Sequence, residues 1–216
     1  MTRRILVLGG GFAGLWSALA AARARAVFGA DLEIVLLSDT PWHSIRVRNY
    51  EADLSDTRVA LDNVLAPVDV RRLQGMVTGI DAASRIVTYE AEGATQAIGY
   101  DRLVFALGSR LARPPIPGLA EHGFDVDTYD AAMRLNEHIA HLPSDASTVL
   151  VVGGGLTGIE AAAEMPGKLR AAGIATPRVI LADHAPRIGS DMGAEAVTVI
   201  EEALQVLGVE MRGGVS

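Results

Sequence analysis

A ten-residue pattern that occurs twice constrains the fold of this chain more than any other feature. The first copy, Ile5–Gly14, reads ILVLGGGFAG, and the second copy, Val149–Gly158, reads VLVVGGGLTG. In each copy an apolar run leads into three glycines. Repeat architectures such as solenoids and propellers have periods of about 20–50 residues. The much longer spacing seen here indicates two similar domains.

Each copy is followed by residues that predict a strand–helix–strand unit. The apolar runs suit strands that are buried on both faces of a parallel sheet. Helices are expected over residues 16–25 and 159–172, and Pro166 is expected to kink or break the second helix. Second strands are expected at 33–37 and 178–182. The sequence therefore predicts an α/β protein with two Rossmann-like, parallel-sheet domains.

Less regular elements are expected between the two units. Residues 44–65 suggest one or two helices that are broken near Asp56. Residues 70–90 suggest short strands with a turn at 81–84, and residues 103–106 suggest another buried strand. The first domain shows no obvious return strand after these residues.

We expect the domain boundary at the proline-rich run Pro114–Gly118, which suits neither a helix nor a central strand. The first domain would then span residues 1–112 and the second residues 113–216. Further elements of the second domain are expected at 129–142 (helix), at 189–207 (helix) and from Val209 (third strand). A mononucleotide-binding half is complete only as βαβαβ. The second domain is therefore expected to be incomplete, as in a piece of a longer chain.

The glycines of the first copy have the GxGxxG spacing of a dinucleotide-binding loop, at Gly9, Gly11 and Gly14. The first glycine allows a tight turn, the second lets the backbone approach a pyrophosphate, and the third lets the helix pack on the strand. The helix dipole then favours the phosphates. The same spacing recurs at Gly153, Gly155 and Gly158. The spacing alone is weak evidence, but its place between strand and helix strengthens it.

A carboxylate is expected just past the second strand, where it accepts both hydroxyls of a ribose. In the first domain Ser38 occupies that position and Asp39 follows it, so Asp39 is either a ribose ligand or a turn residue. In the second domain Asp183 is in register, which favours NAD(H) over NADP(H). Arg187 either softens that preference or is a solvated loop residue.

Two dinucleotide sites on one chain imply that one cofactor passes a hydride to the other. Glu160 follows the second loop closely, and we expect it in the first turn of the helix. It either complements the helix dipole or places a polar group near a nicotinamide or flavin ring. His138 and His141 have a spacing compatible with a metal, but no third ligand is evident, so we expect no metal site.

The composition excludes several classes of protein. The chain has no cysteine, which excludes a disulfide scaffold, a cysteine zinc site, an iron–sulfur cluster and a redox dithiol, and fits the cytoplasm. A net charge of −7 argues against a nucleic-acid partner. Residues 5–22 form an uncharged run, but their glycine spacing favours a strand and a helix over a signal peptide. Lys168 is the only lysine, so lysine Schiff-base or P-loop chemistry has no other candidate.

These residues resemble the two-dinucleotide-domain flavoproteins of the pyridine nucleotide-disulfide oxidoreductase superfamily, over nearly the whole chain. The chain is most similar to the type II NADH dehydrogenases (NADH:quinone oxidoreductases), whose Asn-Tyr-His and Leu-Tyr segments fall at Pro41–His43 and Tyr50–Glu51. The other segments that carry the resemblance are Gly9–Gly14, Tyr100–Val104, Ala106–Ser109, Ile116–Gly118 and Gly153–Glu160. The missing cysteines exclude the disulfide-reductase branch.

The resemblance implies FAD on the first domain, NADH on the second, and hydride transfer from NADH through FAD to a quinone-like small-molecule acceptor. The residues implied to hold FAD are Gly9, Gly11, Phe12, Ala13, Gly14, Val77, Ala106, Leu107 and Gly108, with Ser38 and Asp39 at the ribose position. The residues implied to hold NADH are Gly153, Gly155, Leu156, Thr157, Gly158 and Asp183. Glu160 matches the glutamate that the family places near the nicotinamide.

The chain also departs from the family pattern. Ser38 replaces the ribose-binding acid, and Arg46-Val47 replaces a Gln-Pro pair near the flavin. The Gly-Asp segment that closes over the flavin and the C-terminal domain that carries dimer or membrane contacts have no counterpart. We therefore expect a homodimer, or a peripheral position at the inner face of the membrane, only through such a missing part.

Two alternatives stay open. A ferredoxin or rubredoxin reductase would use the same two cofactor sites with a different acceptor. A truncated remnant would bind nucleotide without turnover, and we expect the isolated chain to be inactive or weakly active.

Overall fold

The computed structural model describes residues 2–143 and 148–215. The chain folds into two compact units, which are not continuous in sequence. Unit 1 contains Met1–Ile45 and Ser55–Leu111, and unit 2 contains Arg46–Leu54 and Ala112–Ser216. The short segment 46–54 therefore leaves unit 1 and joins unit 2, which the sequence did not suggest.

Unit 1 is built around a four-stranded parallel sheet in the order β5-β2-β1-β9. The strands are β1 (Arg3–Leu8), β2 (Leu32–Ser38), β5 (Arg71–Gln74) and β9 (Arg102–Phe105). Helix α1 (Phe12–Phe28) connects β1 to β2 and ends at Gly29, whose φ of 59° provides a left-handed cap. The predicted first strand–helix–strand unit is confirmed.

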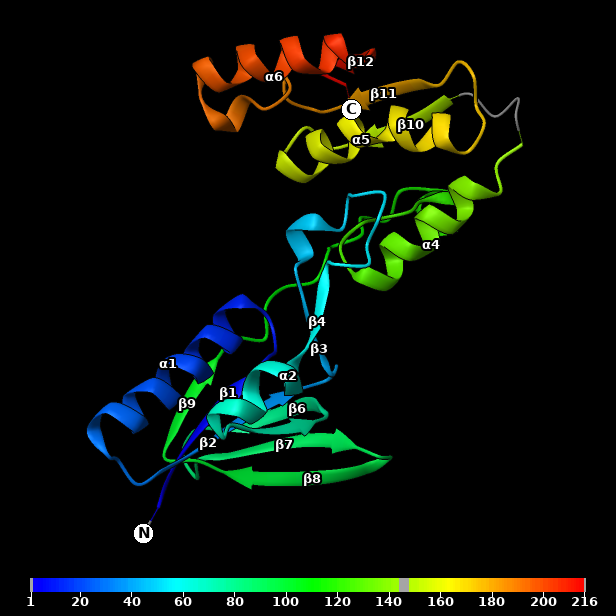
Figure 1. Ribbon diagram of the computed structural model, residues 1–216. Helices are drawn as coiled ribbons and strands as arrows, with labels where there is room; N and C mark the ends of the chain where they lie inside the picture. Colours follow the sequence, from blue (N-terminus) through cyan, green and yellow to red (C-terminus); the bar gives the residue numbers. More distant parts are fainter. Residues whose placement is uncertain (1, 144–147, 216) are drawn as a thin grey trace. The chain divides into compact units, whose positions relative to one another are not determined.

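Both faces of this sheet are covered (Figure 1). Helices α1 and α2 (Leu61–Leu65) pack on one face, over side chains such as Val7 and Leu36. The other face carries Leu6 and Leu37, which pack against an antiparallel meander. The meander consists of β6 (Met76–Asp81), β7 (Ile86–Ala91) and β8 (Ala94–Gly99). Because successive side chains of a strand point to opposite faces, the apolar run of β1 fills two cores at once.

The turn predicted at residues 81–84 is confirmed. It joins β6 to β7, and the Asp81 carboxylate accepts the N–H groups of Ala83 (2.9 Å) and Ser84 (3.1 Å). The Ser84 side chain, followed by the same two backbone N–H groups, holds the pKa of Asp81 below its usual value through hydrogen bonds. A carboxylate that bonds backbone two residues ahead is the standard way for aspartate to stabilise a turn.

Two expectations for unit 1 are wrong. Residues 44–65 do not form one or two broken helices. They contain the end of β3 (Trp42–Ser44), a 3-10 turn (Arg46–Arg48), β4 (Arg58–Ala60) and only then the short helix α2, with a second 3-10 turn (Ala66–Val68) after it. Aspartate and serine in residues 53–56 compete with helix formation through their side-chain hydrogen bonds. The strand at 103–106 is not buried either, because β9 lies at the sheet edge and leaves Phe105 68% exposed.

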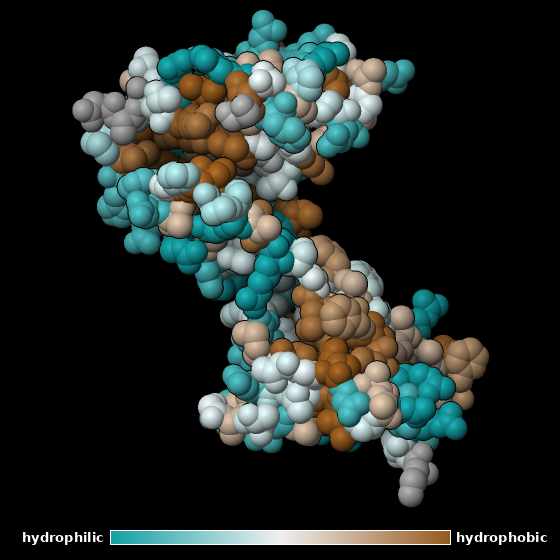
Figure 2. Space-filling view, turned by 180° about the vertical axis from the view of Figure 1, so that it is seen from behind, coloured by the Kyte–Doolittle hydropathy of each residue, from teal (hydrophilic) through white to brown (hydrophobic). Residues whose placement is uncertain are grey.

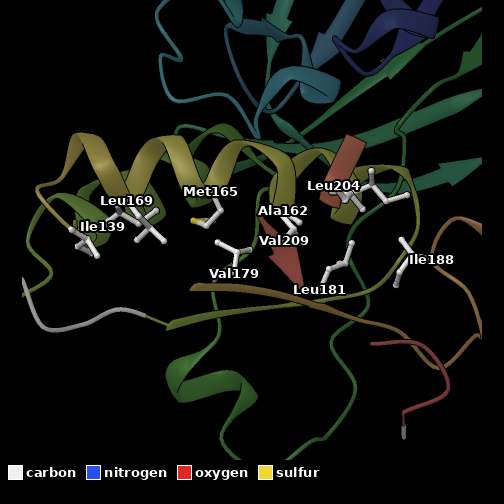
Figure 3. Packing of buried hydrophobic residues seen from close by; sticks show 11 residues of the cluster. Ile139, Ala162, Met165, Leu169, Val179, Leu181, Ile188, Leu204 and Val209 are labelled. Atoms are coloured by element: carbon white, nitrogen blue, oxygen red, sulfur yellow. The ribbon is translucent and has the colours of Figure 1, made fainter. Parts of the chain in front are cut away.

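Unit 2 contains a three-stranded parallel sheet in the order β10-β11-β12. Its elements are α3 (Leu119–His122), α4 (Tyr129–Ala140), β10 (Thr148–Val152), α5 (Leu156–Ala171), β11 (Arg178–Ala182), a 3-10 turn (Ser190–Met192), α6 (Ala194–Val206) and β12 (Val209–Arg212). The predicted 189–207 helix is thus interrupted at Gly193, whose φ is 89°. Figure 3 shows Ala162, Met165 and Leu169 of α5 pointing toward Val179 and Leu181 of β11.

Of the kink or break expected at Pro166, the break does not occur, because helix α5 continues to Ala171. Proline removes one N–H donor and crowds the carbonyl four residues earlier, which is costly in a helix interior. Met165 and Leu169, on either side of Pro166, belong to the buried core cluster of unit 2. Since most helical stability in proteins comes from tertiary packing, the packing of α5 offsets the lost hydrogen bond.

The first strand of unit 2 is not buried on both faces, which corrects the expectation from its apolar run. β10 is an edge strand, and one of its faces carries Val149 and Val151, which pack on the core beside α5. The alternate side chains are exposed, Leu150 by 59% and Val152 by 72%. Figure 2 shows apolar side chains reaching the surface in both units. Within the described residues, no helix is long and apolar enough to cross a membrane.

Candidate functional site

The first glycine loop connects β1 to α1, and its three glycines differ in what the fold requires of them. Gly9 has a φ of 102°, and a Cβ there would lie 2.2 Å from the Ala106 carbonyl oxygen. A Cβ on Gly14 would lie 1.9 Å from the Gly9 carbonyl oxygen. Gly11 is the N-cap of α1 with extended backbone (φ −72°, ψ −173°), and a Cβ there would meet nothing within 4 Å. The fold therefore needs Gly9 and Gly14, whereas Gly11 leaves space open at the helix N-terminus.

The segment after β9, which the family resemblance implies as part of the FAD site, lies against this loop through Ala106 and Leu107. The Ala106 N–H donates to the Leu8 carbonyl (3.0 Å), which continues the sheet by one residue and brings the segment against Gly9. Gly108 has a φ of 73°. Phe12 and Ala13 are exposed in the first turn of α1. The structure thus brings Ala106 and Leu107 against the loop that leads into the N-terminus of α1, where backbone N–H groups and the dipole favour an anion.

A buried histidine supports the same loop, and sequence reasoning assigned it no role. His43 of β3 is 7% exposed, and its Nδ1 lies 2.9 Å from the Gly10 carbonyl oxygen. Its ring also meets the Phe12 ring edge-on, with 4.8 Å between centroids. The contact spans more than thirty residues of sequence. Because it depends on the β3–β4 hairpin, which was not predicted, no local signal could have revealed it.

The ribose position of unit 1 holds no carboxylate. Ser38 is 4% exposed, and its hydroxyl accepts the Thr40 N–H at 3.4 Å. Its side chain packs against Gly10, where an added Cβ would lie 3.0 Å from the Ser38 hydroxyl oxygen. Asp39 is exposed. Val77 lies in β6, half-buried against the core cluster that includes Leu8 and Leu37. Ser38 therefore occupies the position at the end of β2 where a ribose-binding carboxylate is expected. The roles of Asp39 and Val77 in binding FAD stay predictions.

In the second glycine loop, between β10 and α5, the fold again requires the first and third glycines but not the middle one. Gly153 has a φ of 110°, and a Cβ on Gly158 would lie 1.8 Å from the Gly153 carbonyl oxygen. Gly155 is the N-cap of α5 with extended backbone (φ −76°, ψ 178°), and a Cβ there would meet nothing within 4 Å. Leu156 and Thr157 are exposed in the first turn. Two loops in separate units therefore leave the same space at the same helix position.

Unlike its counterpart Ser38, Asp183 places a carboxylate at the second loop. One carboxylate oxygen accepts the Gly154 N–H (2.5 Å), and the other accepts the Ala185 N–H (2.6 Å). These backbone hydrogen bonds, with a smaller effect from His184, hold the pKa of Asp183 below its usual value. Arg187 is paired with Glu201 of α6, with N···O distances of 3.0 and 2.6 Å, and its effect on the cofactor preference stays a prediction. The carboxylate is ionised and fixed against the loop backbone.

Glu160 lies one turn deeper in α5 than predicted, since no acidic residue falls in the first turn of that helix. The benefit of a helix dipole is confined to the first turn. Instead, burial raises the pKa of the half-buried Glu160 carboxyl. Tyr50, from the segment 46–54, has its phenol pKa raised by burial and by the charge of Glu160. The structure thus places Tyr50 near Glu160 in unit 2, which the sequence could not show.

His138 of α4 and His141, which caps the C-terminus of α4, make other contacts. His138 stacks on Phe124 with 4.5 Å between ring centroids, and His141 Nδ1 lies 2.8 Å from the Glu137 carbonyl oxygen. Across the part of the chain that the structure covers, no cluster of three or more His, Asp or Glu side chains could hold a metal ion.

Two strand–helix–strand units, each with a glycine loop shaped by the same close backbone contacts, are the architecture of the dinucleotide-binding fold class, present twice in this chain. The chain belongs to the pyridine nucleotide-disulphide oxidoreductase family, whose sequence pattern matches residues 3–216.

The similar proteins include named oxidoreductases. The chain is 53% identical over 226 residues to the NADH dehydrogenase-like protein Rv1812c of Mycobacterium tuberculosis, covering 99% of this chain and 56% of that protein. It is 30% identical to the type II NADH:quinone oxidoreductase Ndh of the same organism, covering 98% of this chain and 50% of that protein. The chain therefore spans about half the length of these relatives.

The fold is also similar to solved structures. NDH2 from Plasmodium falciparum in complex with NADH superposes with a TM-score of 0.80 at 16% identity, covering 99% of this chain and 48% of that chain. The sulfide:quinone oxidoreductase from Aquifex aeolicus superposes with a TM-score of 0.80 at 20% identity, covering 99% and 51% of the two chains. At these identities the likeness supports the two Rossmann-like folds, and their prediction is confirmed.

Proposed function

We propose that this chain is the nucleotide-binding part of a flavin-dependent NADH oxidoreductase. FAD binds the loop of unit 1, NADH binds the loop of unit 2, and electrons pass to a quinone-like acceptor. The observation that carries the proposal is the open space at Gly11 and Gly155, at two helix N-termini where the fold itself does not demand glycine. The names of the relatives support the nicotinamide donor and the quinone acceptor.

In unit 1 the pyrophosphate of FAD fits the space at Gly11, with the N–H groups of the first turn of α1 directed at it. Phe12 and Ala13 follow this space in the first turn of α1, and Ala106 and Leu107 lie against Gly9 of the same loop. When bound, FAD supplies the chemistry of accepting a hydride and passing electrons on. Because Ser38 cannot bridge two ribose hydroxyls as a carboxylate does, we expect weaker FAD binding than in a loop with an acid there.

In unit 2 the NADH pyrophosphate fits the space at Gly155, beside Leu156 and Thr157. The ionised Asp183 accepts the ribose hydroxyls and repels a 2′-phosphate, which favours NADH over NADPH. Glu160 is the catalytic residue of the proposal, as the polar side chain beside the nicotinamide. Its raised pKa reflects a partly desolvated position, as is common for groups at functional sites.

Asp183→Asn is expected to weaken NADH binding by about tenfold or more, because a hydrogen bond to a charged acceptor contributes about 1.5–3 kcal/mol. It should also narrow the preference for NADH over NADPH, since the repelling charge is lost. Asparagine keeps one acceptor oxygen for the loop backbone, so the fold should persist. Titration calorimetry with each nucleotide measures both effects, and Asp39→Asn in unit 1 is the matched control. Unchanged NADH affinity in Asp183→Asn would remove this residue from the site.

The visible absorption spectrum of the purified chain, after incubation with FAD and removal of excess, tests the function. Bands near about 370 and about 450 nm are expected of bound oxidised flavin. They should bleach when NADH is added without oxygen. A colourless chain whose melting temperature nevertheless rises with nucleotide would instead favour a nucleotide-binding remnant without turnover.

The acceptor site, a homodimer and a peripheral position at the cytoplasmic face of the membrane belong to the same proposal. They rest on the relatives, which are about twice as long as this chain. A ferredoxin or rubredoxin as acceptor is the alternative. Reduction of a soluble quinone analogue by NADH in the presence of the chain, against reduction of ferredoxin under the same conditions, separates the two.

A further inference from the structure

Lys168, the only lysine of the chain, is buried in unit 2. Its side chain comes from the last part of α5, and the residue is 7% exposed. Lysine is almost never fully buried unless it is paired. Here it lines a pocket of about 380 Å³ between α4, α5 and the segment 46–54. The walls of the pocket are otherwise mostly apolar, formed by Ile139 and four alanines, while Asn136 is the other polar side chain that lines it.

The amine is held in place by a short chain of hydrogen bonds. Lys168 Nζ donates to the Asn136 side-chain oxygen (2.9 Å), and the Asn136 amide nitrogen donates to the Ala52 carbonyl oxygen (3.1 Å). The second contact fixes the orientation of the amide, so that its oxygen faces the lysine. A neutral amine still has N–H groups to donate. The contact to Asn136 can therefore persist after deprotonation, while the nitrogen lone pair is free to point into the pocket.

The surroundings favour the neutral form of this amine. Burial lowers the pKa of Lys168 to about 8, and the negative charge of Glu164, one turn earlier on α5, opposes that effect only in part. The lining residues that face it from α4 and from segment 46–54 are Asn136 and Ala52, which carry no charge. The eighteen arginines cannot be deprotonated in proteins. Lys168 is thus the side-chain amine of this chain that can act as a nucleophile near neutral pH.

We propose that Lys168 is a site of covalent acylation, at which a short activated acyl group enters the pocket and is transferred to Nζ. The nitrogen attacks the carbonyl carbon of an acyl phosphate or a thioester and a C–N bond forms. The bond from that carbon to the phosphate oxygen or thioester sulfur breaks, and phosphate or thiolate leaves with the bonding electron pair. The one proton lost by the amine is taken up by the leaving group, directly or through solvent. The apolar walls suit a short aliphatic acyl chain. The resulting amide keeps one N–H for Asn136 and removes a buried charge.

Acylation requires neither FAD nor NADH, so it can be measured on the chain as it stands. The folded protein is incubated with acetyl phosphate in one arm and with acetyl-coenzyme A in the other, over a range of pH. Intact mass and peptide mapping separate the two primary amines, the amino terminus and Lys168. A lysine amide with a blocked α-amine, present in the same tube, serves as the exposed reference.

We expect Lys168 to react about tenfold faster than the reference at pH 8. At pH 8 roughly half of the Lys168 amine is neutral, against roughly 0.4% of an ordinary lysine, which raises the expected rate roughly a hundredfold. A less basic amine is a weaker nucleophile, and this lowers the expected rate by roughly a factor of ten. The rate should reach half its maximum near pH 8. Lys168→Arg should abolish labelling at this position. Ala171→Leu, which narrows the pocket and leaves the lysine intact, should slow it.

Two results would overturn the proposal. One is a folded chain in which the amino terminus reacts and Lys168 reacts only after unfolding in urea, since the lysine would then be a structural cation. The other is an acylation rate of Lys168 that depends on pH as that of the exposed reference lysine does, with half its maximum reached well above pH 9. Labelling in only one arm would support the site and identify whether the acyl source is a phosphate or a thioester.

Discussion

Gly158→Ala is expected to destabilise unit 2 by about 3 kcal/mol or more, at or above the upper end of the usual range for overpacking. The added Cβ would lie 1.8 Å from the Gly153 carbonyl oxygen. The obstacle is backbone rather than a flexible side chain, so it can move away only if the turn between β10 and α5 changes its conformation. Urea unfolding followed by circular dichroism measures the loss, and we expect a large fall in the unfolding midpoint.

Gly167→Ala is the matched control, because it adds the same methyl group to the same helix. Gly167 is exposed, and a Cβ there would meet nothing within 4 Å. Alanine is favoured over glycine in a helix interior by about 1 kcal/mol, so this variant should be slightly more stable than the parent chain. Equal stabilities of the two variants would show that the close approach at Gly158 is absent in solution.

Gly155→Ala is expected to leave the stability of unit 2 nearly unchanged and to reduce NADH affinity by about a hundredfold. The backbone at Gly155 is extended and its surroundings are open, so alanine fits without strain. A slightly poorer helix N-cap is offset by the smaller conformational entropy of the unfolded chain. The methyl group would occupy the space that the proposal assigns to the pyrophosphate. Calorimetric titration with NADH, alongside the same unfolding experiment, separates binding from folding.

Gly11→Ala in unit 1 provides the corresponding control, since that position is equally open and the variant should fold normally. It should lower FAD affinity and leave NADH binding intact. An NADH affinity in Gly155→Ala equal to that of the parent chain would argue that no phosphate approaches this helix. The three glycines of α5 and its N-cap thus predict three different outcomes for one added methyl group.

The elements that the sequence predicted well are those whose signal is local. The repeated pattern identified β1, β10, α1 and α5 because an apolar run, a glycine loop and a helix follow one another directly. The turn at Asp81 carries its own stabilising side chain. The burial of β9 and β10 was predicted wrongly. An apolar run indicates that a strand is suited to a core, but its position at a sheet edge depends on the other strands.

The residues of the candidate site also fall into those with a local sequence signal and those placed by tertiary packing. The glycine positions and Asp183 follow from spacing and register along the chain. His43 and Tyr50 could not be assigned structural roles, because they reach Gly10 and Glu160 through a hairpin and a segment whose places are set by tertiary packing. The resemblance to a family marked both positions without giving either a contact. Pro166 illustrates the opposite case. Proline locally disfavours a helix interior, yet α5 continues through Pro166 because its neighbours pack in the core of unit 2.

The double attachment of Asp183 bears on how this protein could acquire a different nucleotide preference. The carboxylate that would discriminate against a phosphorylated ribose is also an acceptor for the backbone of the glycine loop. A single change to a small or basic side chain would leave the Gly154 N–H without its partner. Evolution or engineering toward NADPH therefore needs a second substitution that restores an acceptor, and intermediates along that route should have a loosened loop before they gain a new specificity.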